Sequence, residues 1–230
     1  TIGSLKIDSA QERIKKFNPN SELLTFAERI NTKNALEIIQ KFDIICDCSD
    51  NFGTRYLIND ACLILNKPLV FGSVQGFEGQ VSVFNLNKTS PNLRDLLPES
   101  PSKNTVPSCA EYGVVGVSTG LIGIIQVNEI IKIILKKGEV LDGKIMVFDL
   151  LNMNTKKLHL KSDQVNKQIN NLSKFMDYYS DDECSTQTGT INRINACDFN
   201  SLYKIKPNKI LLIDVRENEE FSASAIEGSI

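Results

Sequence analysis

The sequence is poor in features that several kinds of site would need. It has one histidine, His159, on an alternating and strand-like stretch, so a catalytic cysteine–histidine pair is poorly supported and a solvated surface position is expected for it. The formal net charge is only −2, so no basic field indicates nucleic acid as a partner. No long apolar run is free of polar residues. The most apolar stretch, 114–135, favours a core helix over a membrane span because it is interrupted by Gln126, Asn128, Glu129 and Lys132.

Disulfide and nucleotide-loop signals are also missing. The six cysteines lie far apart in a chain too long to need disulfides, and no secretory signal precedes them. We therefore expect reduced thiols in a cytoplasmic protein. No Gly-rich phosphate loop of either standard kind is present. The chain starts at Thr1 beside a helical pattern and stops at Ile230 after a strand-like one, so we expect it to be a fragment.

The first part of the chain alternates between strand and helix patterns. Helical periods are expected at 5–17, 33–41 and 52–65. Strands are expected at 22–30, at the apolar run 42–46, which is typical of a strand buried on both faces, and at 68–74. This rhythm predicts an α/β fold with a doubly wound, mostly parallel, Rossmann-like sheet.

The pattern then changes along the chain. Residues 75–85 predict a turn and an antiparallel strand, 85–108 a Pro-, Ser- and Asn-rich loop, 117–136 a long helix, and 143–161 a hairpin that ends the sheet. We therefore predict one domain over residues 1–160. A polar linker is expected over 161–189, and a second α/β pattern begins at 190 and runs to 230.

The stretch FDIICDCSDNFGTR, residues 42–55, places polar groups where a strand ends. Ligands of doubly wound sheets bind at the carboxyl ends of strands, and a carboxylate such as Asp50 can hold Mg²⁺ against a phosphate. The alternative is that Asp50 or Asn51 caps the following helix. Cys46 and Cys48 would share one strand face, and buried, inert thiols are the expected reading because a single Cys-x-Cys pair is weak evidence for zinc.

Two further residues are candidates. Lys6 opens a helix, where the helix dipole does not favour a cation, so it suits a phosphate ligand, although an exposed surface lysine is the commoner case. Cys109 lies in a loop beside Gly-rich sequence and is the best candidate for a reactive thiol, with a purely structural cysteine as the alternative.

Five blocks of the sequence resemble, in order, the ThiF/MoeB/HesA family, the adenylyltransferases of ubiquitin-like sulfur-carrier proteins. The similarity spans about residues 1–160, and the tail 209–230 resembles the first part of a rhodanese domain. The blocks are IGSLKIDSAQERIKKFNPN, DIICDCSDNFGTRYLINDAC, PLVFGSVQGFEGQVSVF, VPSCAEYGVVGVSTGLIGIIQVNEIIKIIL and GKIMVFDLLNMNTKKLHLK.

The resemblance implies an activity and a set of roles. Lys6 matches the family's ATP-contacting lysine, and Asp50 and Asn51 match its Asp-Asn pair at the nucleotide and Mg²⁺. Cys109 matches the cysteine that forms a thioester or disulfide with the carrier in some members. The implied reaction is ATP-dependent adenylation of the C-terminal Gly-Gly carboxylate of the carrier, by a homodimer that needs neither nucleic acid nor membrane.

The sequence also departs from the family. The Gly-rich loop of the family would lie before Thr1. Many members bind zinc through two Cys-x-x-Cys pairs. At the position of the first pair this sequence reads SPNLRDLLP, with Asn92 and Asp95 instead of cysteines. At the position of the second pair it has at most one cysteine, Cys184. Since a tetrahedral zinc site needs four good ligands, no zinc is expected. These departures slightly favour a rival reading, a degenerate scaffold that binds a carrier without activating it. The presence of all four matching residues favours the enzyme; they are Lys6, Asp50, Asn51 and Cys109. A dinucleotide oxidoreductase is a weaker third reading.

Overall fold

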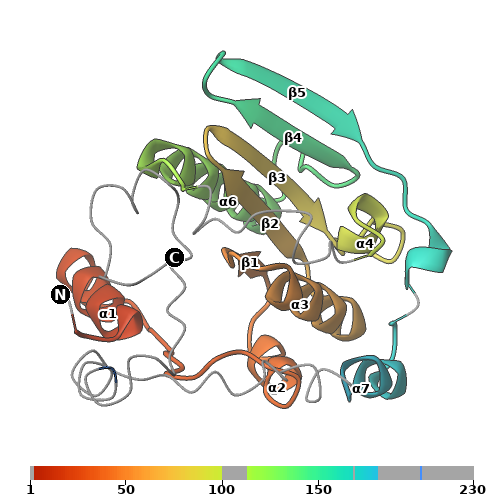
Figure 1. Cartoon of the computed structure of the whole chain (residues 1–230), viewed down its shortest axis with the longest axis horizontal. Coiled ribbons are helices and arrows are strands. Elements are labelled where there is room, and N and C mark those ends of the chain that lie inside the picture. Colours follow the sequence, from red (N-terminus) through yellow and green to blue (C-terminus); the bar gives the residue numbers. More distant parts are fainter. Residues whose placement is uncertain (1–2, 100–112, 168, 181–202, 204–230) are drawn as a thin grey trace. The chain divides into compact units, whose positions relative to one another are not determined.

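The structure is a computed structural model, and it describes residues 3–99, 113–167, 169–180 and 203 (Figure 1). The chain divides into two compact units, residues 1–181 and 182–230. Only Tyr203 of the second unit is described, so everything below concerns the first. The predicted domain from 190 to 230 and its resemblance to rhodanese lie outside the described residues.

Five strands form one mixed sheet in the sequential order β1-β2-β3-β4-β5 (Figure 1). Strands β1 and β2 pair in parallel, and the other three neighbouring pairs are antiparallel. The α/β class and the antiparallel extension are thus confirmed, with a parallel part limited to one pair among the described residues. The strands are β1 Ile45–Asp47, β2 Leu69–Gln75, β3 Glu78–Phe84, β4 Lys144–Asp149 and β5 Asn154–His159.

Helices connect and cover these strands. The helical patterns predicted at 5–17, 33–41, 52–65 and 117–136 are all present as helices. Residues 161–180, expected to belong to a linker, instead carry a short 3-10 helix and α7. The helices are α1 Lys6–Phe17, α2 Ala35–Ile39, α3 Phe52–Leu65, α4 Leu93–Leu96, α6 Gly116–Leu135, the 3-10 helix η1 Gln164–Lys167 and α7 Leu172–Ser180.

The strand predicted at 22–30 does not form. This segment has suitable residues, but a strand is defined by backbone hydrogen bonds to a neighbour. No described strand pairs with it, and β1 pairs on one side only, with β2. The same fact overturns the expectation that β1 is buried on both faces, since only Asp47 of its three residues is buried.

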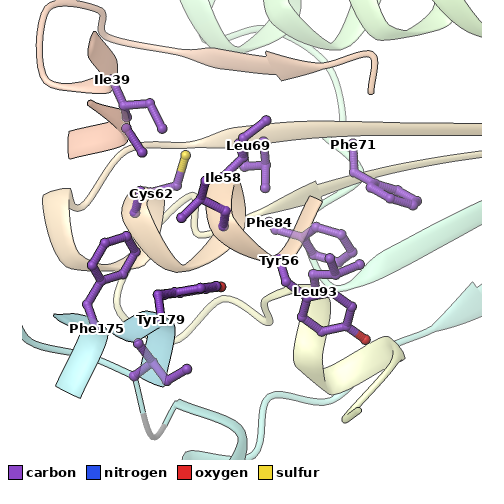
Figure 2. Close-up of a cluster of buried hydrophobic side chains, with 14 residues drawn as sticks. Ile39, Tyr56, Ile58, Cys62, Leu69, Phe71, Phe84, Leu93, Phe175 and Tyr179 are labelled. Atoms are coloured by element: carbon purple, nitrogen blue, oxygen red, sulfur yellow. The ribbon is translucent and has the colours of Figure 1, made fainter. Parts of the chain in front are cut away.

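The core has two parts, one on each face of the sheet. Alternate residues of β2 point to opposite faces, so Leu69 and Phe71 enter one cluster and Val70 enters the other. The first cluster includes the rings of Phe71 and Phe84, whose centroids lie 5.5 Å apart, and draws side chains from α3, α4 and α7 (Figure 2). The second cluster packs α6 against β2 and β3 through Ile122, Val70, Val81, Val83 and Leu141.

Helix α6 approaches the sheet closely because glycines lie beneath it. A Cβ on Gly72 would come within 2.4 Å of the Gln126 side chain, and one on Gly79 within 2.5 Å of Ile122. By length and composition alone α6 is apolar enough to cross a membrane, a test that the core helix of a soluble protein also passes. Its polar residues Gln126 and Glu129 nevertheless face inward, where both are buried. Glu129 accepts a hydrogen bond from the backbone N–H of Leu141 at 2.9 Å.

Candidate functional site

The site begins at the turn that follows β1. Asp47 is buried, and its carboxylate Oδ1 accepts a hydrogen bond from the backbone N–H of Ser49 at 2.8 Å. The Gln126 amide donates to the backbone oxygen of Asp47 at 2.8 Å, and the Arg55 guanidinium donates to the backbone oxygen of Ser49 at 2.7 Å. Strand β1, helix α3 and helix α6 therefore each contribute a group that fixes this turn.

Adjacent side chains at the end of the turn have different roles. Asn51 is the N-cap of α3, with extended backbone angles, and its Oδ1 accepts a hydrogen bond from the backbone N–H of Thr54 at 2.9 Å. Asp50 is exposed, and among the described residues its one contact is a long one, 3.4 Å from the Asn51 amide. The capping role that the sequence left open between them thus belongs to Asn51, and the Asp50 carboxylate takes no part in capping. A metal-binding role of Asp50 stays a prediction.

The position of Asp50 suits a cation bound to phosphate. It follows the carboxyl end of β1, and parallel β2 runs in the same direction and continues beyond that end. It also lies directly before the N-terminus of a 14-residue helix, whose partial positive charge attracts anions such as a nucleotide phosphate. An exposed carboxylate oxygen is the hard ligand that Mg²⁺ prefers.

The structure does not bring all the predicted residues together. Lys6 is the first residue of α1, as expected, and its side chain is exposed, but Lys6 and Asp50 form no hydrogen bond or ion pair with one another. None of the residues of α1 is buried. Cys109 lies outside the described residues. Asp50 and Asn51 are therefore the described part of the predicted site.

The thiols near this site differ from the prediction. Cys46 and Cys48 do share one face of the strand, with their sulfur atoms 3.9 Å apart, but both are exposed, so the expectation of buried, inert thiols is wrong for them. Among the described strands β1 pairs with β2 alone, so their side of the strand is incompletely covered by these residues. Cys62, in α3, is buried, and burial raises the pKa of its thiol above the usual range.

Sequence reasoning missed three residues that hold the turn, namely Asp47, Arg55 and Gln126. Gln126 was noticed only as an interruption of an apolar stretch. A polar residue inside an apolar helix signals a buried hydrogen bond, because a buried amide without partners is costly. That signal identifies Gln126 as a candidate partner for the sheet, but only the fold identifies Asp47 as the group it binds.

The segment around Asn92 and Asp95, which the resemblance places at the first zinc-ligand pair, is held by a network of hydrogen bonds. Asn92 and Asp95 form a capping box at α4, in which the backbone N–H of Asn92 donates to Asp95 Oδ2 at 2.8 Å. The other oxygen of Asp95 accepts from the backbone N–H of Asp163 at 2.8 Å and from the Asn166 amide at 3.1 Å. Both carboxylate oxygens of Asp95 are thus occupied by protein groups. Cys184 lies outside the described residues.

Comparison with known proteins identifies the relatives of this chain. The model of the ThiF family matches residues 1–169. The adenylyltransferase and sulfurtransferase MOCS3 of Culex quinquefasciatus is 36% identical over 244 residues, covering 100% of this chain and 55% of that protein. The sulfur carrier protein adenylyltransferase of Thermus thermophilus is 40% identical over 164 residues, covering 70% of this chain and 60% of its own length. The chain thus spans only somewhat more than half the length of these curated relatives.

Solved structures agree on the fold. The crystal structure of Escherichia coli MccB with ATP superposes with a TM-score of 0.59 at 15% identity, over 71% of this chain and 50% of the other. The structure of PaaA gives a TM-score of 0.57 at 15% identity, over 70% of this chain and 49% of that chain. With the family model covering most of its length, and with relatives above 30% identity along the whole chain, this chain belongs to the ThiF family.

Proposed function

We propose that this chain is the adenylating part of an enzyme that activates a ubiquitin-like sulfur-carrier protein. The reaction joins the C-terminal glycine carboxylate of the carrier to the α-phosphorus of ATP and releases pyrophosphate. Relatives named as adenylyltransferases of sulfur carriers and of molybdopterin synthase support it. The observation that carries the proposal is the exposed Asp50 carboxylate, which takes no part in helix capping at the end of β1.

Different residues of this chain would have different roles at the nucleotide phosphates. Asp50 would hold Mg²⁺, and the ammonium of Lys6 would add a second positive charge. Bound Mg²⁺ would neutralise the negative charge on the phosphate oxygens as this charge shifts towards the leaving pyrophosphate. Asn51 uses its side-chain oxygen for the cap, so its amide, which makes the long 3.4 Å contact with Asp50, is the part of the side chain that could donate to the nucleotide. The turn that presents Asp50 is fixed by Asp47, Arg55 and Gln126, which reduces the reorganisation needed on binding.

The test is pyrophosphate exchange in the full-length protein, with purified candidate carriers. Asp50→Ala should reduce carrier-dependent exchange by about a thousandfold or more, because loss of a metal ligand removes several kcal/mol of transition-state stabilisation. Asp43→Ala, which removes an exposed carboxylate just before β1, is the matched control and should leave exchange unchanged. Normal exchange by Asp50→Ala would return Asp50 to a structural role. A wild-type protein that binds carriers without any exchange would support the scaffold.

Cys109 is proposed to act after adenylation. Its thiolate would attack the acyl-adenylate or exchange with a persulfide, and neither step is adenylation itself. Cys109→Ser should therefore leave pyrophosphate exchange within about twofold of wild type but slow sulfur transfer to the carrier. It should also remove any carrier–enzyme adduct on a non-reducing gel. Transfer at the wild-type rate would make Cys109 a structural residue.

The remaining assignments are proposals of the same kind. We propose a cytoplasmic homodimer without zinc. The occupied oxygens of Asp95 support the absence of zinc from that segment. A second copy of the chain would bury the apolar side chains that α6 exposes away from the sheet, and exposed apolar patches mark such interfaces. These side chains are Val117, Ile124, Val127, Ile131 and Ile134.

A further inference from the structure

A hydrogen-bonded connection joins two segments that lie far apart in the chain, and it uses no residue of the proposed nucleotide site. Oδ1 of Asp95, in α4, accepts from the backbone N–H of Asp163 at 2.8 Å and from the Asn166 side-chain amide at 3.1 Å. The side-chain amide of Asn92, the N-cap of α4, lies 3.5 Å from the backbone oxygen of Asn166. The two partners of Asp95 are 68 and 71 positions away in the sequence. These four residues form what we call the α4–η1 junction.

Lys167, the last residue of η1, adds a second contact between the same two segments. The residue is buried, and its ammonium group donates to the backbone oxygen of Lys88 at 2.9 Å. Lys88 lies a few residues before α4. A buried ammonium without a hydrogen-bond partner is costly, so this contact favours the arrangement in which η1 lies against the segment before α4. The chain is therefore held to itself over residues 88–95 and 163–167.

The residues of the α4–η1 junction have the spacing of two metal-ligand pairs. Asn92 and Asp95 are three positions apart, and so are Asp163 and Asn166. Two Cys-x-x-Cys pairs have this same spacing, and a zinc ion bound by them fastens two distant segments. The resemblance to the family left at most Cys184 for the second pair, whereas the partners that the structure gives to Asp95 come from residues 163 and 166.

The groups around Asp95 do not fit a metal ion. Its Oδ2 accepts from the backbone N–H of Asn92 at 2.8 Å and from the Asn92 side-chain amide at 3.1 Å. With the two N–H groups at Oδ1, hydrogen-bond donors fill the roughly four acceptor positions that a carboxylate offers. The Asn92 side-chain oxygen is used as well, since it accepts from the backbone N–H of Arg94 at 2.7 Å. A cation at this position would face the positive ends of N–H dipoles instead of open ligand atoms.

We propose that the α4–η1 junction stands in the place of the zinc site found in many family members, and that hydrogen bonds to Asp95 fasten the two segments without a metal. This inference goes beyond the proposed function and does not depend on adenylation. The chain runs from the junction into α7, whose Tyr179 hydroxyl donates to Asp60 of α3 at 2.7 Å. The junction therefore also helps to hold α7 against the core.

The first experiment measures amide hydrogen exchange in the full-length protein, by mass spectrometry of a peptide that covers residues 161–167. Asp95→Ala should speed exchange in this peptide by about tenfold or more, because the Asp163 N–H loses its acceptor and the segment is released. Asp149→Ala is the matched control, since Asp149 accepts from the N–H groups of Leu151 and Asn152 within its own turn. The control should leave the peptide unchanged. Exchange at the wild-type rate in Asp95→Ala would overturn the proposal.

Two further measurements distinguish hydrogen bonding from metal binding and from simple space filling. Prolonged incubation of the wild-type protein with EDTA should leave exchange of residues 161–167 unchanged, and faster exchange after chelation would overturn the proposal. Asp95→Asn has nearly the same size as the native side chain, but one of its two ends becomes a donor that faces N–H groups. It should therefore exchange about threefold faster than wild type or more. A silent Asp95→Asn would mean that Asp95 only fills space, which also contradicts the proposal.

The position of the junction is tested by supplying four thiol ligands. A variant that combines Asn92→Cys, Asp95→Cys, Asp163→Cys and Asn166→Cys should retain about one zinc ion per chain after dialysis, because four thiolates at this spacing form a tetrahedral site. Exchange of residues 161–167 should then become faster when EDTA is added. Circular dichroism checks that the variant is folded. A folded variant that binds no zinc would overturn the claim that the junction stands in the place of a metal site. If this variant does not fold, the single substitutions and the chelation test still decide whether the fastening is free of metal.

Discussion

Two carboxylates ten residues apart in the sequence have opposite environments. Asp60, on the inner side of α3, is fully buried, and its oxygens receive two hydrogen bonds from Arg94, at 3.0 and 2.7 Å, and one from the Tyr179 hydroxyl at 2.7 Å. Asp50, which precedes the N-cap of the same helix, is exposed and has one long amide contact among the described residues. A carboxylate whose oxygens are satisfied by the protein holds the fold together, and one whose oxygens remain open is available to a ligand.

The region around Asp60 is a closed polar network inside the core. The Arg94 guanidinium lies over the rings of Tyr56 and Tyr178, at 4.8 and 4.9 Å from their centroids. Burial raises the pKa of Tyr56 to about 12 and also raises the pKa of Tyr179, so both hydroxyls stay protonated as donors. The network joins α3, α4 and α7 next to the apolar cluster of Figure 2.

The largest expected effect comes from breaking this network. Arg94→Met should lower the free energy of unfolding by about 3–5 kcal/mol, because it leaves the Asp60 carboxylate buried without its ion pair. Asp50→Ala should change it by no more than about 0.5 kcal/mol, as expected of an exposed side chain outside any network. Urea unfolding of both variants makes the comparison. Equal losses would mean that the two carboxylates do not differ in the way their contacts indicate.

An intermediate loss of stability is expected from a substitution at Gly72, which packs against the side chain that holds the Asp50 turn. Gly72→Ala places a methyl group within 2.4 Å of Gln126, whose amide holds the backbone of Asp47. Overpacking of this kind typically costs about 1–3 kcal/mol of stability. Gly120→Ala, in α6 with no atom within 4 Å of the new Cβ, is the matched control and should be neutral or stabilising by up to about 1 kcal/mol. If Gly72→Ala were as stable as the control, the turn would not depend on the close packing of α6.

The smallest expected change in stability distinguishes the roles of two adjacent residues in the turn, Asp50 and Asn51. Asn51→Ala should lower the free energy of unfolding by about 1 kcal/mol, because the Thr54 N–H loses its cap, while Asn51→Asp should retain most of it. Asp50→Ala is again the comparison, with no cap to lose. A greater loss of stability in Asp50→Ala than in Asn51→Ala would show that the capping roles are reversed.

Local patterns in the sequence predicted most elements but not their partners. Helix α3 was predicted at residues 52–65, its observed bounds, because an apolar stripe and a polar cap mark it in the sequence itself. The segment 22–30 shows the limit, since its strand-like composition has no described neighbour to pair with. Helix α7 contributes Phe175 and Tyr179 to the core. Its sequence was too polar and too weakly periodic to be predicted as a packed helix.

The sequence by itself determined the α/β class, the family, and the position of Asp50 and Asn51 at a strand end, because these depend on residue order and local periodicity. Only the tertiary structure decided which of the two caps α3 and which stays open. It alone placed Cys46 and Cys48 at an exposed edge, and it joined Asp60 to Arg94 and Tyr179. The physical reason is that burial and hydrogen-bond partners come from segments distant in the chain, and the choice between a structural and a chemical role follows from them.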